Sequence, residues 1–370
     1  MNQKSYPCSD GALPPANGER RTVNPELQTP MLEGTPTSLQ PVDMHVHVLG
    51  NGKSGSGCRL SIPWWQHPFI QIMARHVGLR VSSQDPALDN LFVERLRGWL
   101  NESSLHQAVI LACDDVYDKR GIRYPGLSGL FVPNAYVLAL ARRFPEFLPG
   151  VSIHPAREDA LDELERCAQA GAVLLKLLPC VQIVDCNDQR HKPFWELLAR
   201  LKLPLLAHTG GEFSLPTHRY DLQSVETLRL PLECGVTVIA AHCGTPALPW
   251  DKDYFDQFDR MRNAFPTLFG DISALSQFTH MRTIERLRDD PRQVLYGSDY
   301  PVVTGVFWSW AKGWISRRDL NRLRSIQNPL EKKFQLTKAL GFPDRIFTDF
   351  WRLVKRNGTG RSPSLPGSLR

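Results

Sequence analysis

The feature that most constrains this chain is a regular alternation of short apolar segments with stretches of helical periodicity. Eight segments rich in Val, Ile and Leu recur along the chain, and each has about the length of a buried strand. The stretches between them often fit amphipathic helices, most clearly at 157–169, which ends before Gly171, and at 193–202. The predicted strands are 42–48, 107–112, 147–153, 172–178, 203–208, 236–242, 267–273 and 293–298.

Strands that alternate with helices predict a parallel sheet. Eight strands close a TIM barrel, so the sequence predicts the α/β class and a (β/α)8 barrel. An open, doubly wound sheet is the alternative, and a GxGxxG turn behind the first strand would favour it. The glycine-rich segment 50–57 has no helix start directly behind it, so we interpret it as a loop rather than a nucleotide site. Long loops after the first and last strands, at 49–90 and 299–330, would lie on the catalytic face.

The barrel is expected to form a single domain over residues 41–356, because α/β barrels of about 250 residues commonly fold as one unit. Residues 1–40 are rich in Pro, Gly, Ser and Thr and are expected to form a flexible leader. Residues 357–370 are expected to form a flexible tail for the same reason.

Composition restricts the class of protein. The chain has 370 residues, of which 42% are hydrophobic and 22% charged, which is typical of a globular protein. It has no apolar run of membrane-spanning length, and residues 1–40 lack the apolar core of a secretory signal. The eight cysteines include no CxxC pair, so reduced thiols and a cytoplasmic location are expected.

The net charge argues against nucleic acid and membrane partners. The formal charge is +6, but residues 351–370 contain five basic residues and no acid, so the rest of the chain is nearly neutral. Nucleic-acid-binding proteins usually carry the basic face on the folded domain. We therefore expect a small-molecule substrate as the partner, and we leave a homodimer open.

The strongest local motif for chemistry is the pair His45 and His47. Alternate residues of a strand point to the same side, so these two imidazoles can bind one cation. Three further polar residues, His208, His242 and Asp299, lie at the ends of predicted strands, and Lys176 lies within one. Strand ends converge on one pocket in a barrel, and burying this many polar groups is costly unless they bind each other or a metal. Imidazole and carboxylate together suit zinc first, with manganese, iron or nickel as alternatives.

These motifs together resemble the amidohydrolase superfamily, specifically the amidohydrolase-related metal-dependent hydrolases. The resemblance extends from about residue 41 to about residue 305 and implies a metal at the carboxyl-terminal face of the barrel. The matching segments, in the order of the family, are DMHVH (43–47), LLKLLP (174–179), LAHTGGE (206–212), IAAHCG (239–244) and LYGSDYP (295–301).

The resemblance implies a role for each of the six residues. His45 and His47 match the ligands of the first strand, His208 that of the fifth, and His242 the sixth-strand histidine. Asp299 matches the aspartate that ligates metal and takes a proton from the attacking water. Lys176 falls where two-metal members carry a carbamylated lysine that bridges the ions, so either one or two divalent ions are expected.

The two versions of the site differ physically. With one ion, a metal-activated water would attack the substrate, and His242 would orient the water or stabilise the oxyanion. With two ions, His208 and His242 would hold the second, and Lys176 would need a carbamate, because a free ammonium would repel both ions. A Lys176 side chain that reaches out to a substrate anion is the alternative.

Other residues are open to two interpretations. His154 either lines the pocket or lies at the start of a helix. Glu212 is expected to be a solvated loop acid rather than a contact to substrate or to a ligand residue. Asp271 either orients a ligand histidine or has a structural role. The aromatic segments 60–69 and 307–314 would either cover the pocket or pack together. Arg317 and Arg318 would either hold a carboxylate or be solvated.

The sequence therefore predicts a metal-dependent hydrolase that cleaves an amide, lactone or ester of a small molecule. The first alternative is a metal-dependent decarboxylase of an aromatic or unsaturated acid on the same barrel. A catalytically silent scaffold barrel and a nuclease are alternatives of other classes, and the filled ligand positions and the near-neutral body argue against them respectively.

Overall fold

The computed structural model describes residues 39–61 and 67–354. The predicted leader and tail therefore lie outside the described residues apart from positions 39 and 40, and so does much of the aromatic segment 60–69. In the part of the chain that is described, no helix is long and apolar enough to cross a membrane. Its seven cysteines are free thiols, as expected.

Eight parallel strands pair in chain order and form one sheet. Each lies within one of the eight apolar segments of the sequence, which confirms the predicted strand order. The strands are β1 (Val42–His47), β3 (Gln107–Leu111), β7 (Phe147–Val151), β8 (Leu174–Leu177), β9 (Leu205–His208), β10 (Val238–Ala241), β11 (Leu268–Asp271) and β12 (Val294–Leu295).

The sheet closes between β1 and the segment that follows β12. Val46 and Tyr300 form a parallel bridge. The His47 amide donates to the Tyr300 carbonyl at 2.8 Å, and the Asp299 amide donates to the His45 carbonyl at 2.9 Å. The predicted eighth strand is thus regular for only two residues, because its continuation pairs with β1 instead. The closed sheet is the predicted TIM barrel.

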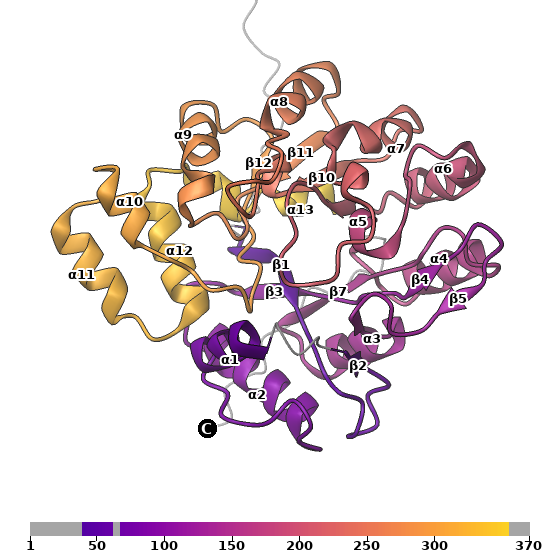
Figure 1. The fold of residues 1–370 in the computed structure, drawn as a ribbon, viewed down its shortest axis with the longest axis horizontal. Helices are drawn as coiled ribbons and strands as arrows, with labels where there is room; N and C mark the ends of the chain where they lie inside the picture. Colours follow the sequence, from indigo (N-terminus) through magenta and orange to yellow (C-terminus); the bar gives the residue numbers. More distant parts are fainter. Residues whose placement is uncertain (1–38, 62–66, 355–370) are drawn as a thin grey trace, which may run out of the picture. The chain divides into compact units, whose positions relative to one another are not determined.

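Helices surround the strands on all sides in Figure 1. The helix α4 has an acidic first turn and ends shortly before Gly171, which has a φ of +97°, as expected from the sequence. The helices are α1 (His67–His76), α2 (Leu88–Asn101), α3 (Asn134–Arg143), α4 (Ala160–Gln169), α5 (Pro179–Gln182), α6 (Lys192–Leu201), α7 (Arg229–Glu233), α8 (Phe255–Ala264), α9 (Met281–Asp289), α10 (Phe307–Ala311), α11 (Arg317–Ser325), α12 (Pro329–Ala339) and α13 (Phe350–Leu353).

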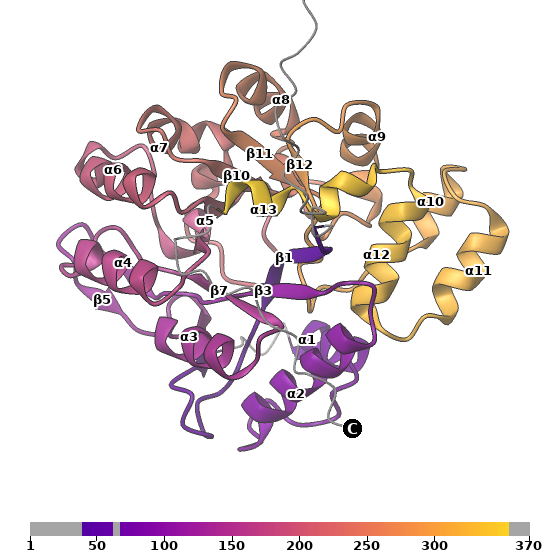
Figure 2. The same ribbon diagram turned by 180° about the vertical axis from the view of Figure 1, so that it is seen from behind.

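The apolar side chains form two separate cores. The larger core lies between the strands and the helices, and the smaller one fills the barrel interior. The interior core includes Met44, Leu174, Leu206 and Leu295, and Phe350 of α13 joins it. Figure 2 shows α13 lying across the strands on the face turned away in Figure 1. This helix closes one end of the barrel, which leaves the other end for the site.

The long insertion after β1 is not only loop. It carries β2 (Arg59–Leu60), which pairs with β6 (Leu130–Phe131), and the helices α1 and α2; β4 (Val116–Tyr117) and β5 (Arg123–Tyr124) form a further hairpin. The glycine-rich segment 50–57 is a loop, as interpreted. It wraps around the buried Asp89 carboxylate, which accepts hydrogen bonds from the Asn51 amide at 2.7 Å and the Ser54 hydroxyl at 3.0 Å. The polar groups of this loop therefore bind the Asp89 side chain rather than a nucleotide phosphate.

Candidate metal centre and active site

A bulge in β1 turns both of its histidines into the barrel. Val42 and Met44 belong to the interior core, whereas Val46, an even-numbered residue of the same strand, packs in the outer core. The pairing register shifts between Asp43 and Val46, which reverses the alternation of side chains. Buried Asp43 holds this bulge, because its Oδ1 accepts from the His45 amide at 3.2 Å and the Ser298 amide at 2.9 Å.

Three ligand atoms of the site lie at equal distances from one another. His45 Nε2, His47 Nε2 and Asp299 Oδ1 are each 3.2 Å apart. Two atoms that share one tetrahedral ion at about 2.1 Å lie about 3.4 Å apart, so this spacing fits a single small cation. Asp299 reaches this position from a turn in which it adopts a φ of +62°. The donor set therefore fits a divalent metal.

His208 and His242 lie next to this triad. His242 Nε2 is 3.9 Å from Asp299 Oδ2, and the rings of His208 and His242 are 4.8 Å apart. His208 Nε2 is buried and has no hydrogen-bond partner. An unpartnered buried nitrogen is costly, and a metal ion would satisfy it. Ligand atoms of His45, His242 and Asp299 all lie within 4.8 Å of one another, so a cation could also be held by this set.

Oxygen atoms close to Nδ1 favour the same tautomer in three of the histidines. His45 Nδ1 is 2.8 Å from Asp271 Oδ2, and His208 Nδ1 is 3.5 Å from Glu212 Oε2. His242 Nδ1 is 3.1 Å from the Ser273 carbonyl oxygen. A carboxylate or carbonyl oxygen can only accept, so each Nδ1 carries the proton and each Nε2 presents a lone pair. Lone pairs at Nε2 are what a metal site needs.

Burial keeps two of these imidazoles neutral. Burial and the Lys176 charge lower the pKa of His45 to about 4, against the opposing influence of Asp299. Burial also lowers the pKa of His208, and the neighbouring His242 lowers it further. Protons therefore do not compete with a metal for these nitrogens at neutral pH.

Asp271 is the hydrogen-bond partner of His45, a candidate metal ligand, which agrees with one of the two interpretations open from the sequence. Besides its bond to His45, its Oδ1 accepts from the His242 amide at 2.8 Å and the Ser273 hydroxyl at 2.6 Å. Burial alone would raise the pKa of Asp271, but its hydrogen bond with His45 holds it below the usual range. This single carboxylate thus orients residues from two strands.

Lys176 lies at the bottom of the site. It is fully buried, and its Nζ is 3.2 Å from His45 Nε2. Burial lowers the pKa of Lys176, and the charges of Asp299 and Asp271 oppose this. The side chain does not line the cavity described below, so it does not reach out to a substrate anion there.

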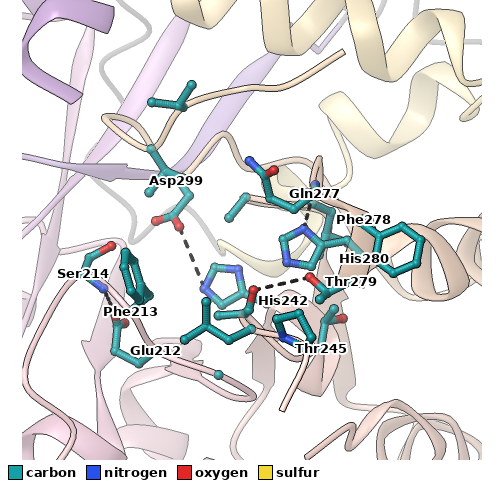
Figure 3. Close-up of a pocket in the computed structure, with 18 of the residues that line it drawn as sticks. Glu212, Phe213, Ser214, His242, Thr245, Gln277, Phe278, Thr279, His280 and Asp299 are labelled. Atoms are coloured by element: carbon teal, nitrogen blue, oxygen red, sulfur yellow. Dashed lines mark hydrogen bonds and ion pairs between the residues drawn. The ribbon is translucent and has the colours of Figure 1, made fainter. Parts of the chain in front are cut away.

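A cavity of about 390 Å³ opens directly beside this cluster. Figure 3 shows Asp299 and His242 facing each other, with Glu212, Phe213 and Ser214 on one side of the pocket and Phe278, Thr279 and His280 on the other. His208, His242 and Asp299 line it, and so does Trp308 from the aromatic segment 307–314. That segment therefore contributes a wall of the pocket.

Two expectations about single residues are settled by the structure. The expectation that Glu212 is a solvated loop acid is wrong: its side chain is 8% exposed, and Oε1 accepts from the Ser214 and Leu215 amides. The loop after β9 folds back and buries it, which raises its pKa. His154 does not line the cavity, because Nε2 contacts the Gln182 carbonyl at 3.0 Å and Nδ1 accepts from the Ala156 amide.

Sequence reasoning missed several residues around the site. Ser273 contacts both His242 and Asp271, and the only sequence signal was its position two residues after Asp271 on the same predicted strand. His280 lines the cavity with Nδ1 accepting from the Ser276 and Gln277 amides. Lys333 of α12 is buried behind the site, and no pattern in its helix distinguishes it from a surface lysine.

Replacing Asp271 with Asn should weaken metal binding by about 10–100-fold, because Asn can present its amide NH2 to His45 and no longer fixes the tautomer. Competition with a chelator measures the affinity. Glu212→Gln is the matched control, and a smaller loss is expected there because the contact to His208 is 3.5 Å rather than 2.8 Å. An Asp271→Asn variant that binds metal as tightly as the original chain would contradict this role.

Comparison with known proteins identifies the family to which the chain belongs. The family model described as amidohydrolase matches residues 42–323. No curated protein matches the chain. An uncharacterised TIM-barrel protein from Bordetella bronchiseptica is 16% identical with a TM-score of 0.51, over 82% of this chain and 100% of that one.

Two further solved structures are similar at lower TM-scores. A protein described as a 2-pyrone-4,6-dicarboxylic acid hydrolase from Pseudomonas putida is 13% identical over 84% of this chain and 94% of that one, with a TM-score of 0.49. A 5-carboxyvanillate decarboxylase from Sphingomonas paucimobilis is 15% identical over 84% and 96%, with a TM-score of 0.42. Since the family model covers most of the chain and the Bordetella structure shares the barrel, this chain belongs to the amidohydrolase family.

Proposed function

We propose that the protein is a metal-dependent hydrolase that cleaves an amide, lactone or ester bond of a small molecule. The observation that supports this proposal most is that the two oxygens of the Asp299 carboxylate have different neighbours. Oδ1 lies 3.2 Å from both His45 Nε2 and His47 Nε2, whereas Oδ2 faces His242 at 3.9 Å. One oxygen can thus hold a cation while the other exchanges a proton at the edge of the cavity.

The ligand set that we propose is His45, His47, His208 and Asp299. Zinc is the proposed ion, with manganese, iron and nickel as alternatives, because imidazole and carboxylate suit all four. When bound, a divalent ion supplies Lewis-acid polarisation of the carbonyl and lowers the pKa of water. His208 Nε2 is buried without a partner, which supports its place in the set. Lys176 remains the residue that decides between one ion and two.

His242 is proposed to orient the attacking water. Its Nδ1–H donates to the Ser273 carbonyl, and this tautomer presents a lone pair at Nε2 toward the cavity. A lone pair accepts a hydrogen bond from water but cannot donate one to an oxyanion. Of the two roles open from the sequence, the tautomer therefore supports orientation of the water.

Asp299 is proposed to move the proton. Burial alone would raise the pKa of this carboxyl, but the adjacent His45 and the hydrogen bond of His47 hold it below its usual range. It is therefore ionised and can accept a proton from water as the new C–O bond forms. The same proton then passes to the departing amine or alcohol as the acyl bond breaks, which completes the addition of water across that bond.

Product analysis tests the proposal. The protein, grown with zinc or manganese, is incubated with a panel of aryl amides, lactones and esters and with aromatic carboxylic acids. We expect a carboxylic acid and an amine or alcohol in equal amounts, without carbon dioxide, and loss of this activity after metal removal. Release of carbon dioxide from the acids alone would support the decarboxylase instead. Turnover of neither group by a metal-loaded chain would support a silent scaffold.

A further inference from the structure

The cavity beside the metal centre has mainly apolar walls away from the reacting groups. Phe278 and Trp308 form one wall with their ring centres 5.0 Å apart, and Leu248, Leu275, Val302 and Val303 contribute aliphatic surface. Its volume of about 390 Å³ lies within the range of about 300–1,000 Å³ that is typical of small-molecule sites. An aromatic ring would gain both apolar burial and ring contacts against Phe278 and Trp308.

The charged side chains that line this cavity are both acidic. They are Glu212 and Asp299, and among the described residues no lysine or arginine lines it. His280 adds no positive charge, because its Nδ1 accepts from two backbone amides and burial lowers its pKa to about 3.

Four basic residues that could pair with a substrate anion do not line the cavity. Lys176 is buried beneath the candidate metal site with Nζ 3.2 Å from His45 Nε2, and Lys333 is buried with Nζ 3.3 Å from the Leu275 carbonyl oxygen. Arg317 and Arg318 are exposed on α11 and do not line the cavity, so the solvated interpretation of this pair holds. A substrate carboxylate placed along this cavity would thus find no cationic partner among the described side chains.

We propose that the cavity selects uncharged aromatic substrates, namely aryl esters, lactones or anilides, and rejects analogues that carry a carboxylate on the ring. The reacting carbonyl would lie at His242 and Asp299, and the ring would lie against Phe278 and Trp308. In this pose a carboxylate on the ring lies away from the metal among apolar side chains, without a cationic side chain to pair with, so its loss of water is disfavoured. This inference rests on the proposed function for the position of the reacting carbonyl.

Binding of two unreactive ketones tests the selectivity without any chemistry. Acetophenone and 4-acetylbenzoate differ only by the carboxylate, and each is titrated into the metal-loaded protein with calorimetric or NMR detection. We expect acetophenone to bind at least 10-fold more tightly. Equal or tighter binding of 4-acetylbenzoate would overturn the inference, and so would failure of both ketones to bind at 10 mM, about the upper limit for so small a ligand.

A positive charge introduced into the wall should remove the preference for the uncharged ketone. Phe278 is 58% exposed, so Phe278→Lys places an ammonium at the cavity edge without opening the core. We expect 4-acetylbenzoate to bind at least 10-fold more tightly to this variant than to the original chain. Tyr220→Lys is the matched control, because Tyr220 is 66% exposed and does not line the cavity, and its preference should equal that of the original chain. An equal gain in both variants would show that the wall does not set the selectivity.

Hydrolysis of the corresponding esters separates the two proposals. Phenyl acetate is the uncharged substrate and 4-acetoxybenzoate is its carboxylated analogue, and phenol release gives kcat/KM for each. We expect about a 100-fold preference for phenyl acetate. Cleavage of both esters without this preference would overturn the selectivity and leave the hydrolase. Selective ketone binding without cleavage of either ester would leave the selectivity and count against the hydrolase.

Discussion

Asp299→Asn is expected to lower kcat/KM by about 10³–10⁴-fold against any substrate that the protein cleaves. Asparagine keeps the size and one oxygen of the side chain, but its amide cannot accept the proton from water, and a positioned acid–base group contributes up to about 10⁴-fold. The metal content of the variant is measured alongside the kinetics, so that loss of proton transfer is separated from loss of the ion. The expected result is a metal-loaded, folded and nearly inactive protein.

Asp115→Asn is the matched control for this variant. Asp115 is also buried, but its partners are Arg59 and Arg123 and it lies outside the cavity. We expect this control to lose stability rather than activity per folded molecule. An Asp299→Asn variant that carries metal and retains more than a tenth of the original kcat/KM would show that another group moves the proton.

Phe350→Ala is expected to lower the free energy of unfolding by about 3–5 kcal/mol. Phe350 is 1% exposed and belongs to the core inside the barrel, where α13 closes one end. Removing a buried aromatic ring costs its transfer energy and leaves a cavity. Chemical denaturation followed by tryptophan fluorescence measures the change.

Tyr220→Ala is the control for this loss. Tyr220 is 66% exposed, so its removal should change the free energy of unfolding by no more than about 0.5 kcal/mol. A loss of less than 1 kcal/mol in Phe350→Ala would show that α13 does not contribute to the barrel core.

The strands could be located from the sequence because buried parallel strands read as continuous apolar runs. Their regular parts are shorter than the runs, as at 293–298, where the chain leaves β11 after Leu295 and pairs with β1. The bulge in β1 left no sequence signal. His45 and His47 nevertheless point the same way, since the Nε2 atoms of both lie 3.2 Å from Asp299 Oδ1.

The six predicted site residues lie together because the ends of parallel strands meet at one end of a barrel. What the sequence could not show is which side chains the loops bring to this end. The burial of Glu212 depends on the fold of residues 209–215, and Trp308 reaches the cavity from a helix after the last strand. Such contacts join residues distant in sequence, and no local periodicity reports them.

The central claim is that this cluster holds a divalent metal, and metal content per chain tests it most directly. Plasma mass spectrometry is applied to protein purified without chelator, together with the variants His47→Ala and Lys176→Ala. We expect at least one tightly held ion per chain, and we expect His47→Ala to lose it. If the chain holds a second ion, Lys176→Ala should lose that ion. A chain that retains no ion under any metal supply, or that retains its ions in His47→Ala, would contradict the account.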